Sequence, residues 1–296
     1  MTDNQRGILL MTLSMAGFSV TDAVLKLASD GVPVAQVLLA FGGGGALIMA
    51  LTARARRRRI WTRAAFHPLV ALRNVMEMLG TWGGVMALSL LPLTTAAAIM
   101  QVAPLTYTAA AAVFLGEKVG WRRWLAICVG FAGVMLIIRP GTEAFNWAAL
   151  WAIGSVLALT VRDIATRRLP PDIDDVSLTA FAYASVTVLA LILLAFDPRV
   201  VEPTLQQQVW LVASSIFGVC SYWCMTGALR TGDVGVVTPF RFTRLLFAIG
   251  IGLVFFGERL DGLTILGSAL VVSSGIYTLW REQLRKRGLP TGQASR

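Results

Sequence analysis

Long apolar runs recur along nearly the whole chain, and no other feature limits its possible folds so strongly. Two of them, Thr94–Leu115 and Trp121–Ile138, are each close to the ~20 residues that a helix needs to cross a bilayer. A charged corner, Gly116-Glu117-Lys118, separates these two runs. Charged residues make up only 14% of the sequence, whereas a soluble protein carries about 25%. We therefore predict an all-α polytopic membrane protein whose surroundings are a lipid bilayer.

The apolar runs predict ten transmembrane helices, and most of the connections between them are short enough to make neighbours antiparallel hairpins. The spans are expected at residues 7–27, 34–53, 69–90, 94–115, 121–138, 147–166, 177–195, 207–229, 235–256 and 263–280. The exception among the short connections is the segment from Arg54 to Phe66, which is rich in arginine.

A single ungapped shift of 141 residues relates the two halves of the chain. The corner at residues 114–118, FLGEK, is echoed at residues 255–259 by FFGER. The same shift maps Asp22 onto Asp163 and Trp82 onto Trp223. Agreement at one offset over widely spaced positions indicates a duplication, so we predict two five-helix repeats, residues 1–140 and 141–296.

The net charge of +10 follows the pattern of topology signals rather than that of a nucleic-acid-binding face, because the positive residues lie in the short loops. With the N-terminus in the cytoplasm, 19 Lys and Arg residues fall on the cytoplasmic side and four on the outer side. The four outer residues are Lys26, Arg139, Arg199 and Arg259. We expect both termini to be cytoplasmic and no nucleic acid to bind.

Each predicted half holds five spans, an odd number, so the second half must enter the membrane upside down relative to the first. Inverted repeats of this kind place a binding site near the bilayer midplane between the halves. Rocking of one half against the other then exposes the site to each side in turn. The helix count therefore predicts a transporter that works by alternating access.

The two Gly-Glu corners, with apolar helices before them and Gly-rich helices after them, resemble the EamA family of the drug/metabolite transporter (DMT) superfamily. The resemblance covers nearly the whole chain and is best over residues 97–138 and 228–278. Family members typically carry a proline in the helix before the corner, and Pro104 fits that pattern. The equivalent position in the second half is Leu245, with Pro239 earlier, so the two helix bends are not expected to be identical.

Within that family, the chain looks similar to the YddG-like bacterial aromatic amino-acid exporters. The resemblance implies the DMT fold of two inverted five-helix repeats, a bacterial inner-membrane location and no cofactor. It also implies secondary transport that exports amino acids, aromatic and other apolar ones included. The alternative substrates are drugs or other small metabolites. An enzyme or a channel is disfavoured, because the carboxylates are scattered along the chain and no ring of filter residues is readable.

Charged side chains inside predicted spans are costly in a bilayer, so each of them is a functional candidate. Arg73 and Glu77 lie four residues apart on one helix face and either pair with each other or take part in gating. Arg241 follows the helix interruption at Pro239 and is expected to extend toward the cytoplasmic water. Arg244 lies deeper. It is either half of a buried pair with Glu77 or a cationic anchor for a substrate carboxylate.

Asp22 and Asp163 are equivalent by the repeat and fall toward opposite ends of the membrane. Each is either a solvent-facing carboxylate near a helix end or a gating or proton-binding group. For Asp163 the neighbouring Arg162 favours the first interpretation.

Several aromatic residues lie too far inside the predicted spans, or too close to the helix interruption, to be membrane-surface residues. They either fill the protein core or wall an apolar substrate cavity. The set comprises Trp82, Tyr107, Tyr222, Trp223 and Phe240. Gln101 and Thr108 offer uncharged hydrogen bonds on the fourth span.

The remaining motif candidates favour structure over chemistry. Three cysteines, Cys128, Cys220 and Cys224, lie in apolar runs without other metal ligands, and the only histidine, His67, has no metal-binding partners. The run Gly42–Gly45 predicts close helix packing, because the strand and the Lys-Ser/Thr pair of a phosphate loop are missing. We therefore expect no metal, no nucleotide drive and a monomer that handles a small-molecule substrate.

Overall fold

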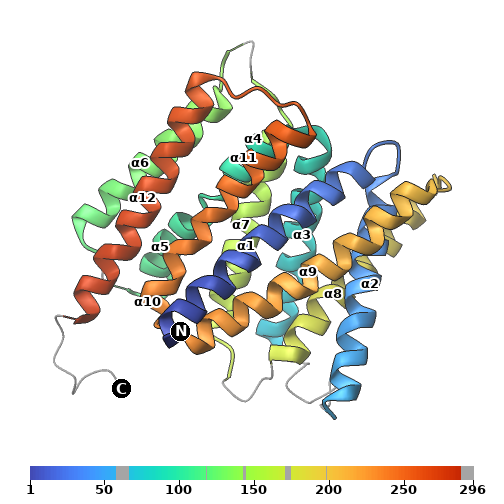
Figure 1. Ribbon diagram of the computed structural model, residues 1–296, viewed down its shortest axis with the longest axis horizontal. Helices are drawn as coiled ribbons and strands as arrows, with labels where there is room; N and C mark the ends of the chain where they lie inside the picture. The colour runs from blue at the N-terminus through green and yellow to red at the C-terminus, as the bar shows by residue number, and fades with distance from the viewer. Residues whose placement is uncertain (58–66, 118, 143–144, 171–174, 198, 288–296) are drawn as a thin grey trace.

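The computed structural model describes residues 1–57, 67–117, 119–142, 145–170, 175–197 and 199–287, and every regular element in these ranges is helical (Figure 1). The elements are α1 (Asp3–Ala28), α2 (Val34–Ala55), α3 (Pro68–Leu90), α4 (Leu93–Met100), α5 (Ala103–Phe114), α6 (Trp121–Ile138), α7 (Ala149–Arg167), α8 (Asp175–Phe196), α9 (Leu205–Thr231), α10 (Val234–Val237), the 3-10 helix η2 (Thr238–Phe242), α11 (Thr243–Phe255) and α12 (Gly262–Arg287). With α4–α5 and α10–η2–α11 counted as one span each, the predicted ten spans are confirmed.

Nine of these helical spans are long and apolar enough to cross a membrane, within the part of the chain that the structure describes. The tenth, α3, has 23 residues and is long enough. It is less apolar because it carries Arg73, Asn74 and Glu77. The polar residues Arg73 and Glu77 of α3 must therefore find partners inside the helix array.

The helix ends sort onto two faces of the array (Figure 1). The start of α1, the end of α2 and the end of α12 lie together on what we term the terminal face, and the ends of α1 and α6 lie on the opposite face. Five positions counted in the charge argument, Arg58, Arg59, Arg63, Lys118 and Arg296, lie outside the described residues.

Helix packing follows the inverted repeat. Helix α1 of the first half packs on α9 of the second half. Their repeat mates, α7 and α3, pack on each other in the same way. The pairs α2 with α8 and α6 with α12 each join a helix to its own repeat mate, and α4 packs on α11, so the broken spans α4–α5 and α10–η2–α11, which are also repeat mates, meet as well. This arrangement is that of two inverted five-helix repeats, as the sequence predicts.

Both helix breaks occur at the same level of the repeat although their prolines do not coincide. In the first half, α5 begins at Ala103 after a two-residue turn, and Pro104 occupies its first turn, where a missing N–H costs nothing. In the second half, Pro239 lies inside η2, and α11 begins at Thr243, the repeat mate of Val102. The breaks therefore share a position but differ in form.

The two Gly-Glu corners are built identically. Gly116 and Gly257 adopt φ values of +68° and +59°, which favour glycine. The next residue in each corner donates its backbone N–H back to the preceding helix, from Glu117 to Ala111 O at 3.3 Å and from Glu258 to Gly252 O at 3.0 Å. Each corner is thus a helix C-cap that fixes the direction in which its glutamate leaves the helix.

The Gly42–Gly45 run brings α2 into close contact with α8 and α9, as predicted. A Cβ atom on Gly42 would lie 2.8 Å from the backbone nitrogen of Thr187. A Cβ on Gly44 would lie 2.4 Å from Ser215 Oγ, and one on Gly45 would lie 2.2 Å from the Tyr183 ring. These distances are too short for any side chain, so glycine sets the spacing of the helices.

Replacing Gly42 with Ala should therefore lower the free energy of unfolding by about 1–3 kcal/mol, because backbone must move to admit the methyl group. Gly43→Ala is the matched control, since a Cβ at that position meets nothing within 4 Å. The control should be neutral or stabilising by up to ~1 kcal/mol through helix propensity. Thermal denaturation in detergent measures both variants. Equal stability of the two would show that α2 does not depend on this contact.

Candidate functional site

Arg244 and Asp22 form a two-pronged ion pair between α11 and α1. The Arg244 Nη2 lies 2.7 and 2.9 Å from the two Asp22 oxygens, and its Nε lies 3.2 Å from Oδ2. The Asp22 side chain is 8% exposed. The Arg244 guanidinium also lies 5.4 Å from the centre of the Phe18 ring, and Ser19 Oγ donates to the Arg244 carbonyl at 2.9 Å. The pair joins α1 of the first repeat to α11 of the second.

The predicted pair between Arg244 and Glu77 is wrong. Arg244 lies on the part of α11 that packs against α1, so the carboxylate within reach is Asp22. Glu77 lies on α3 and is engaged by arginines of α3 and α7. The interpretation of Asp22 as a solvent-facing carboxylate is also wrong, because Asp22 is buried.

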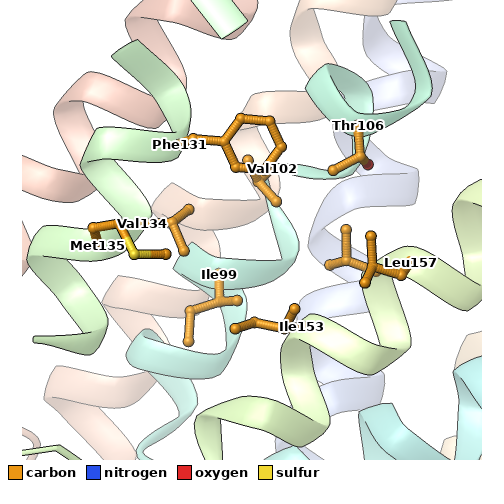
Figure 2. Close-up of a pocket in the computed structure, with 9 residues that line it drawn as sticks. Ile99, Val102, Thr106, Phe131, Val134, Met135, Ile153 and Leu157 are labelled. Carbon is orange, nitrogen blue, oxygen red and sulfur yellow. The ribbon is translucent and has the colours of Figure 1, made fainter. Parts of the chain in front are cut away.

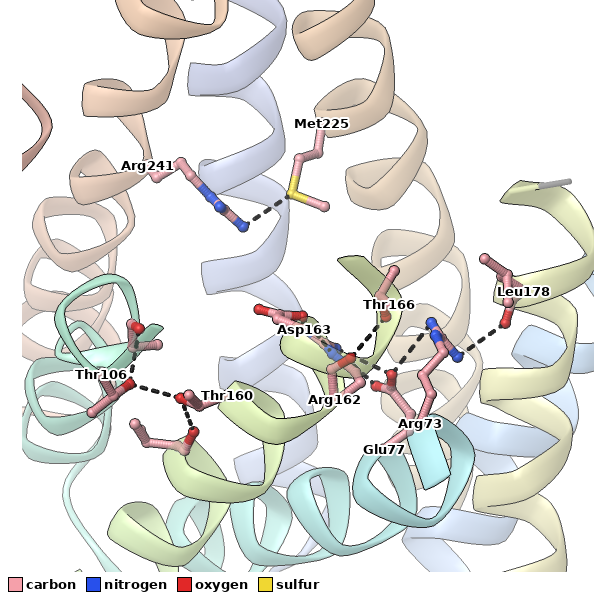
Figure 3. Close-up of polar contacts among 12 residues, drawn as sticks. Arg73, Glu77, Thr106, Thr160, Arg162, Asp163, Thr166, Leu178, Met225 and Arg241 are labelled. Carbon is pink, nitrogen blue, oxygen red and sulfur yellow. Dashed lines mark hydrogen bonds and ion pairs between the residues drawn. The ribbon is translucent and has the colours of Figure 1, made fainter. Parts of the chain in front are cut away.

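A second polar network joins α3, α7 and α8 on the terminal side of the array (Figure 3). Arg162 Nη1 lies 3.1 and 3.2 Å from the two Glu77 oxygens, and its Nε lies 2.8 Å from Asp163 Oδ1. Arg73 completes the network at 3.6 Å from Glu77 and donates to the carbonyl of Leu178 at 3.2 Å. The predicted Arg73–Glu77 pair is present, but Arg162, which was considered from the sequence only as the neighbour of Asp163, lies closer to Glu77 than Arg73 does.

Arg241 differs from the other arginines of this region because it is held by no carboxylate. It is exposed, and its Nη2 makes a long hydrogen bond to Met225 Sδ at 3.6 Å. Figure 3 shows its side chain extending from η2 toward Met225, on the side of Asp163. Among the residues that the structure describes, no ion pair joins Arg241 to an acid.

The charges around this point do not cancel. Three arginines, Arg73, Arg162 and Arg241, face two carboxylates, Glu77 and Asp163. The Asp163 side chain is 43% exposed, and Arg241 interacts with it electrostatically. The region thus has an excess positive charge beside an accessible negative one, which suits a ligand that carries a carboxylate and an ammonium group.

Gln101 connects the two helix breaks. It caps the end of α4, is 8% exposed, and its Nε2 lies 3.4 Å from the carbonyl oxygen of Arg241 in η2. The hydrogen bond joins the break before Pro104 to the break around Pro239. Because both breaks lie at one level, Gln101 helps to set the position of the Arg241 backbone.

The five aromatic candidates have different neighbours. Trp82 packs on Trp151 with ring centroids 5.3 Å apart, beside the main core. Trp223 is 36% exposed, and the guanidinium of Arg56 lies 5.9 Å from its ring. The remaining three are half-buried: Tyr107 accepts a hydrogen bond from Arg167, Tyr222 lies on α9 and Phe240 packs on the cluster around Met11. Their shared role as a cavity wall stays a prediction.

A small pocket lies between α4–α5, α6 and α7, away from these charges (Figure 2). Its lining is almost wholly apolar, with Ile99, Phe131 and Leu157 among the side chains that Figure 2 labels. Its volume is about 70 Å³, well below the ~300 Å³ at which ligand sites begin. The pocket therefore lacks both the room and the polar groups for a metabolite.

The two faces of the array differ in solvent access. On the opposite face, Leu91 and Leu93 are almost fully buried in the main core. On the terminal face, the side chain of Arg167 is 55% exposed, and Asp163 and Arg241 are exposed further in. Exposed charged side chains thus lie on the terminal face, whereas these two leucines of the opposite face are buried.

The residues that suggested chemistry of other kinds have structural roles. His67 caps α3 by accepting the Leu69 backbone N–H on Nδ1 at 3.2 Å. Cys128, Cys220 and Cys224 are free thiols. Within the described ranges, no group of three metal-ligating side chains comes together.

Known proteins resemble the chain in sequence and in fold. The profile of the EamA-like transporter family matches it twice, at residues 5–139 and 146–280. The riboflavin transporter of Rhizobium johnstonii is 29% identical over 215 residues, which cover 73% of this chain and 71% of that protein. The pseudopaline exporter CntI of Pseudomonas aeruginosa is 26% identical over 272 residues, covering 90% of this chain and 93% of the exporter.

One more transporter and one solved structure are also similar to the chain. The S-adenosylmethionine uptake transporter of Rickettsia bellii is 23% identical over 212 residues, covering 72% of each chain. A solved crystal structure covers 94% of this chain and 98% of its own with a TM-score of 0.65 at 18% identity, so it shares the fold. The named relatives are all transporters, and their names differ in both substrate and direction.

Removing either partner of the Arg244–Asp22 pair should lower the free energy of unfolding by about 3–5 kcal/mol, because the other charge is left buried. In a double-mutant cycle, Asp22→Asn and Arg244→Gln should couple by about 1–3 kcal/mol. The matched control is the cycle of Arg244→Gln with Glu77→Gln, in which the two effects should add. Thermal denaturation in detergent gives both values. Coupling to Glu77 instead of Asp22 would contradict this assignment.

Proposed function

The chain belongs to the EamA-like transporter family, and from that premise we propose that it is a secondary transporter that exports amino acids, aromatic and other apolar ones included, across the bacterial inner membrane. The proposed path runs between the two repeats past Arg241, and alternating access moves the substrate along it. The observation that carries the proposal is the exposed guanidinium of Arg241, which is paired with no carboxylate among the described residues and interacts electrostatically with the partly exposed carboxylate of Asp163.

Arg241 replaces Arg244 as the proposed anchor of the substrate carboxylate. Asp22 already occupies the hydrogen-bonding edge of Arg244. Within the described residues, the Arg241 guanidinium is hydrogen-bonded to a thioether, which is a weak acceptor, and is paired with no carboxylate, so its planar donor fork is available. Asp163 is proposed to receive the substrate ammonium group. Tyr222 and Phe240 are the aromatic side chains proposed to contact an apolar substrate side chain.

A second candidate is a transporter for a larger metabolite. It is favoured by the relatives, which are named for riboflavin, S-adenosylmethionine and pseudopaline. Their names also include both uptake and export, so the direction is open to the same test. A flux panel in proteoliposomes that contains amino acids, riboflavin and S-adenosylmethionine, with and without a pH gradient, distinguishes the two candidates.

Arg241→Gln should weaken apparent substrate affinity by about 10- to 100-fold, the effect of losing a charged hydrogen-bonding partner. Arg241→Lys should recover only part of it, because an ammonium keeps the charge but loses the fork. The control is Arg199→Gln, which removes an exposed arginine paired with Asp197 in a loop and should leave flux unchanged. The measurement is concentration-dependent flux at equal protein abundance. Unchanged affinity of Arg241→Gln would place the anchor elsewhere.

The proposed orientation puts the terminal face in the cytoplasm. It is supported by the excess of Lys and Arg in the connections on that side of the chain, 19 against four. A single cysteine at Arg57 should therefore resist a membrane-impermeant thiol reagent added to intact cells, in a variant without native cysteines. A cysteine at Asp30, on the opposite face, should react. The reverse pattern would invert the topology.

A further inference from the structure

Glu258, in the second Gly-Glu corner, reaches across the repeats and caps α4. Its Oε1 accepts the Leu93 backbone N–H at 2.5 Å, and its Oε2 accepts the Thr94 N–H at 3.0 Å and the Thr94 hydroxyl at 2.7 Å. α4 has no cap from its own N-terminal residue, Pro92. A carboxylate at this position satisfies free backbone donors and complements the helix dipole. The contact closes the opposite face between the two repeats.

Lys26 completes this closure from α1. Its Nζ donates to the Leu88 carbonyl at 3.0 Å and to the Leu91 carbonyl, both at the end of α3. It also interacts electrostatically with Glu258 and lies 5.8 Å from the centre of the Phe256 ring. The two charges thus bind the end of one helix and the start of the next.

The 141-residue shift carries every member of this closure onto an equivalent at the terminal face. The equivalents are Arg167 for Lys26, Glu117 for Glu258, Leu229 and Gly232 for Leu88 and Leu91, and Val234 and Gly235 for Leu93 and Thr94. In the structure, Glu117 pairs with Arg167 at 2.7 Å, and the two side chains are 32% and 55% exposed. Equivalent residues are therefore hydrogen-bonded to helix ends on the opposite face and paired with each other, partly exposed, on the terminal face.

We propose that these are two alternating latches: Glu258 and Lys26 hold the opposite face closed, and Glu117 and Arg167 form the equivalent latch when the terminal face closes. The inference rests on the proposed transport by alternating access. In the second state, Glu117 meets the start of the span at residues 234–255, and Arg167 meets the carbonyl end of α9. Glu258 and Lys26 then take up the exposed pairing that Glu117 and Arg167 have now.

Similar latches at the two faces help the two states of such a cycle to have similar free energies. A two-state transporter needs states within a few kcal/mol of each other, and matched contacts at the two faces bring the energies together. Asp233 occupies the position equivalent to Pro92, so the two latches are not identical. In the structure, the latch at the opposite face is the one that is engaged.

Spin-label distances test the latches without any substrate. In the full-length protein without native cysteines, labels at Asp30 and Arg259 span the opposite face, and labels at Gly120 and Thr231 span the terminal face. Glu258→Gln should shift the ratio of the two states by roughly tenfold, about one charge-assisted hydrogen bond. The opposite-face distance should lengthen and the terminal-face distance should shorten. Glu117→Gln alone should change neither distance, and added to Glu258→Gln it should reverse the shift.

The matched control is Glu202→Gln, which removes an exposed carboxylate from the same face as Glu258 and should change nothing. If Glu258→Gln fails to fold, Lys26→Gln replaces it with the same expected direction. Unchanged distances in a folded Glu258→Gln or Lys26→Gln variant would overturn the proposal, as would opening of the opposite face by Glu117→Gln alone. The distance measurements contain no substrate, so their result is independent of the flux assay. The latches can be refuted while amino-acid export is confirmed, and amino-acid export can be refuted while the latches are confirmed.

Discussion

The cost of an unpaired charge away from water determines how this helix array is organised. Asp22 and Arg244 satisfy each other across the repeats, and Glu77 is satisfied by Arg162 and Arg73. The Asp22–Arg244 pair joins α1 to α11, and the Glu77–Arg162 pair joins α3 to α7. Arg241 is the arginine of this region whose charge is left to water or to a ligand in the described structure. Because the buried charges of this region are paired, the guanidinium of Arg241, which pairs with no described carboxylate, supports a binding site there.

The duplication gives the two halves the same helix arrangement, and sequence differences between the halves make their charged residues different. Asp22 and Asp163 are repeat mates, yet Asp22 is buried against an arginine of the other repeat and Asp163 lies exposed beside its sequence neighbour Arg162. Arg244 has no counterpart, because its repeat mate is Ala103. The cross-repeat pair therefore exists on one side only, and the array cannot have two equivalent halves. The exposed carboxylate and the free arginine lie where the symmetry is broken.

Sequence patterns predicted the local structure well because that structure depends on local composition. The ten spans, the glycine contact of α2 and the two corners follow from apolar length, missing side chains and left-handed glycines. The partner of Arg244 could not be predicted in this way, since Asp22 lies 222 residues away and only packing brings it near. Arg162 was missed as the partner of Glu77 because the two residues are 85 positions apart in the sequence and only packing brings them together. Periodicity identifies a helix face but does not identify what that face meets.

The same energetics distinguish the two arginines of the broken helix as substrate anchors. A carboxylate ligand on Arg244 would have to displace Asp22, which is 8% exposed. The displaced charge would then lie buried and unpaired at a cost of about 3–5 kcal/mol, more than the 1.5–3 kcal/mol or so that a new charged hydrogen bond returns. A ligand on Arg241 would displace a long hydrogen bond to the Met225 sulfur and break no ion pair between described residues. Binding at Arg241 is therefore favourable without disturbing the pair that joins the repeats, which leaves that pair free to set the geometry of the site.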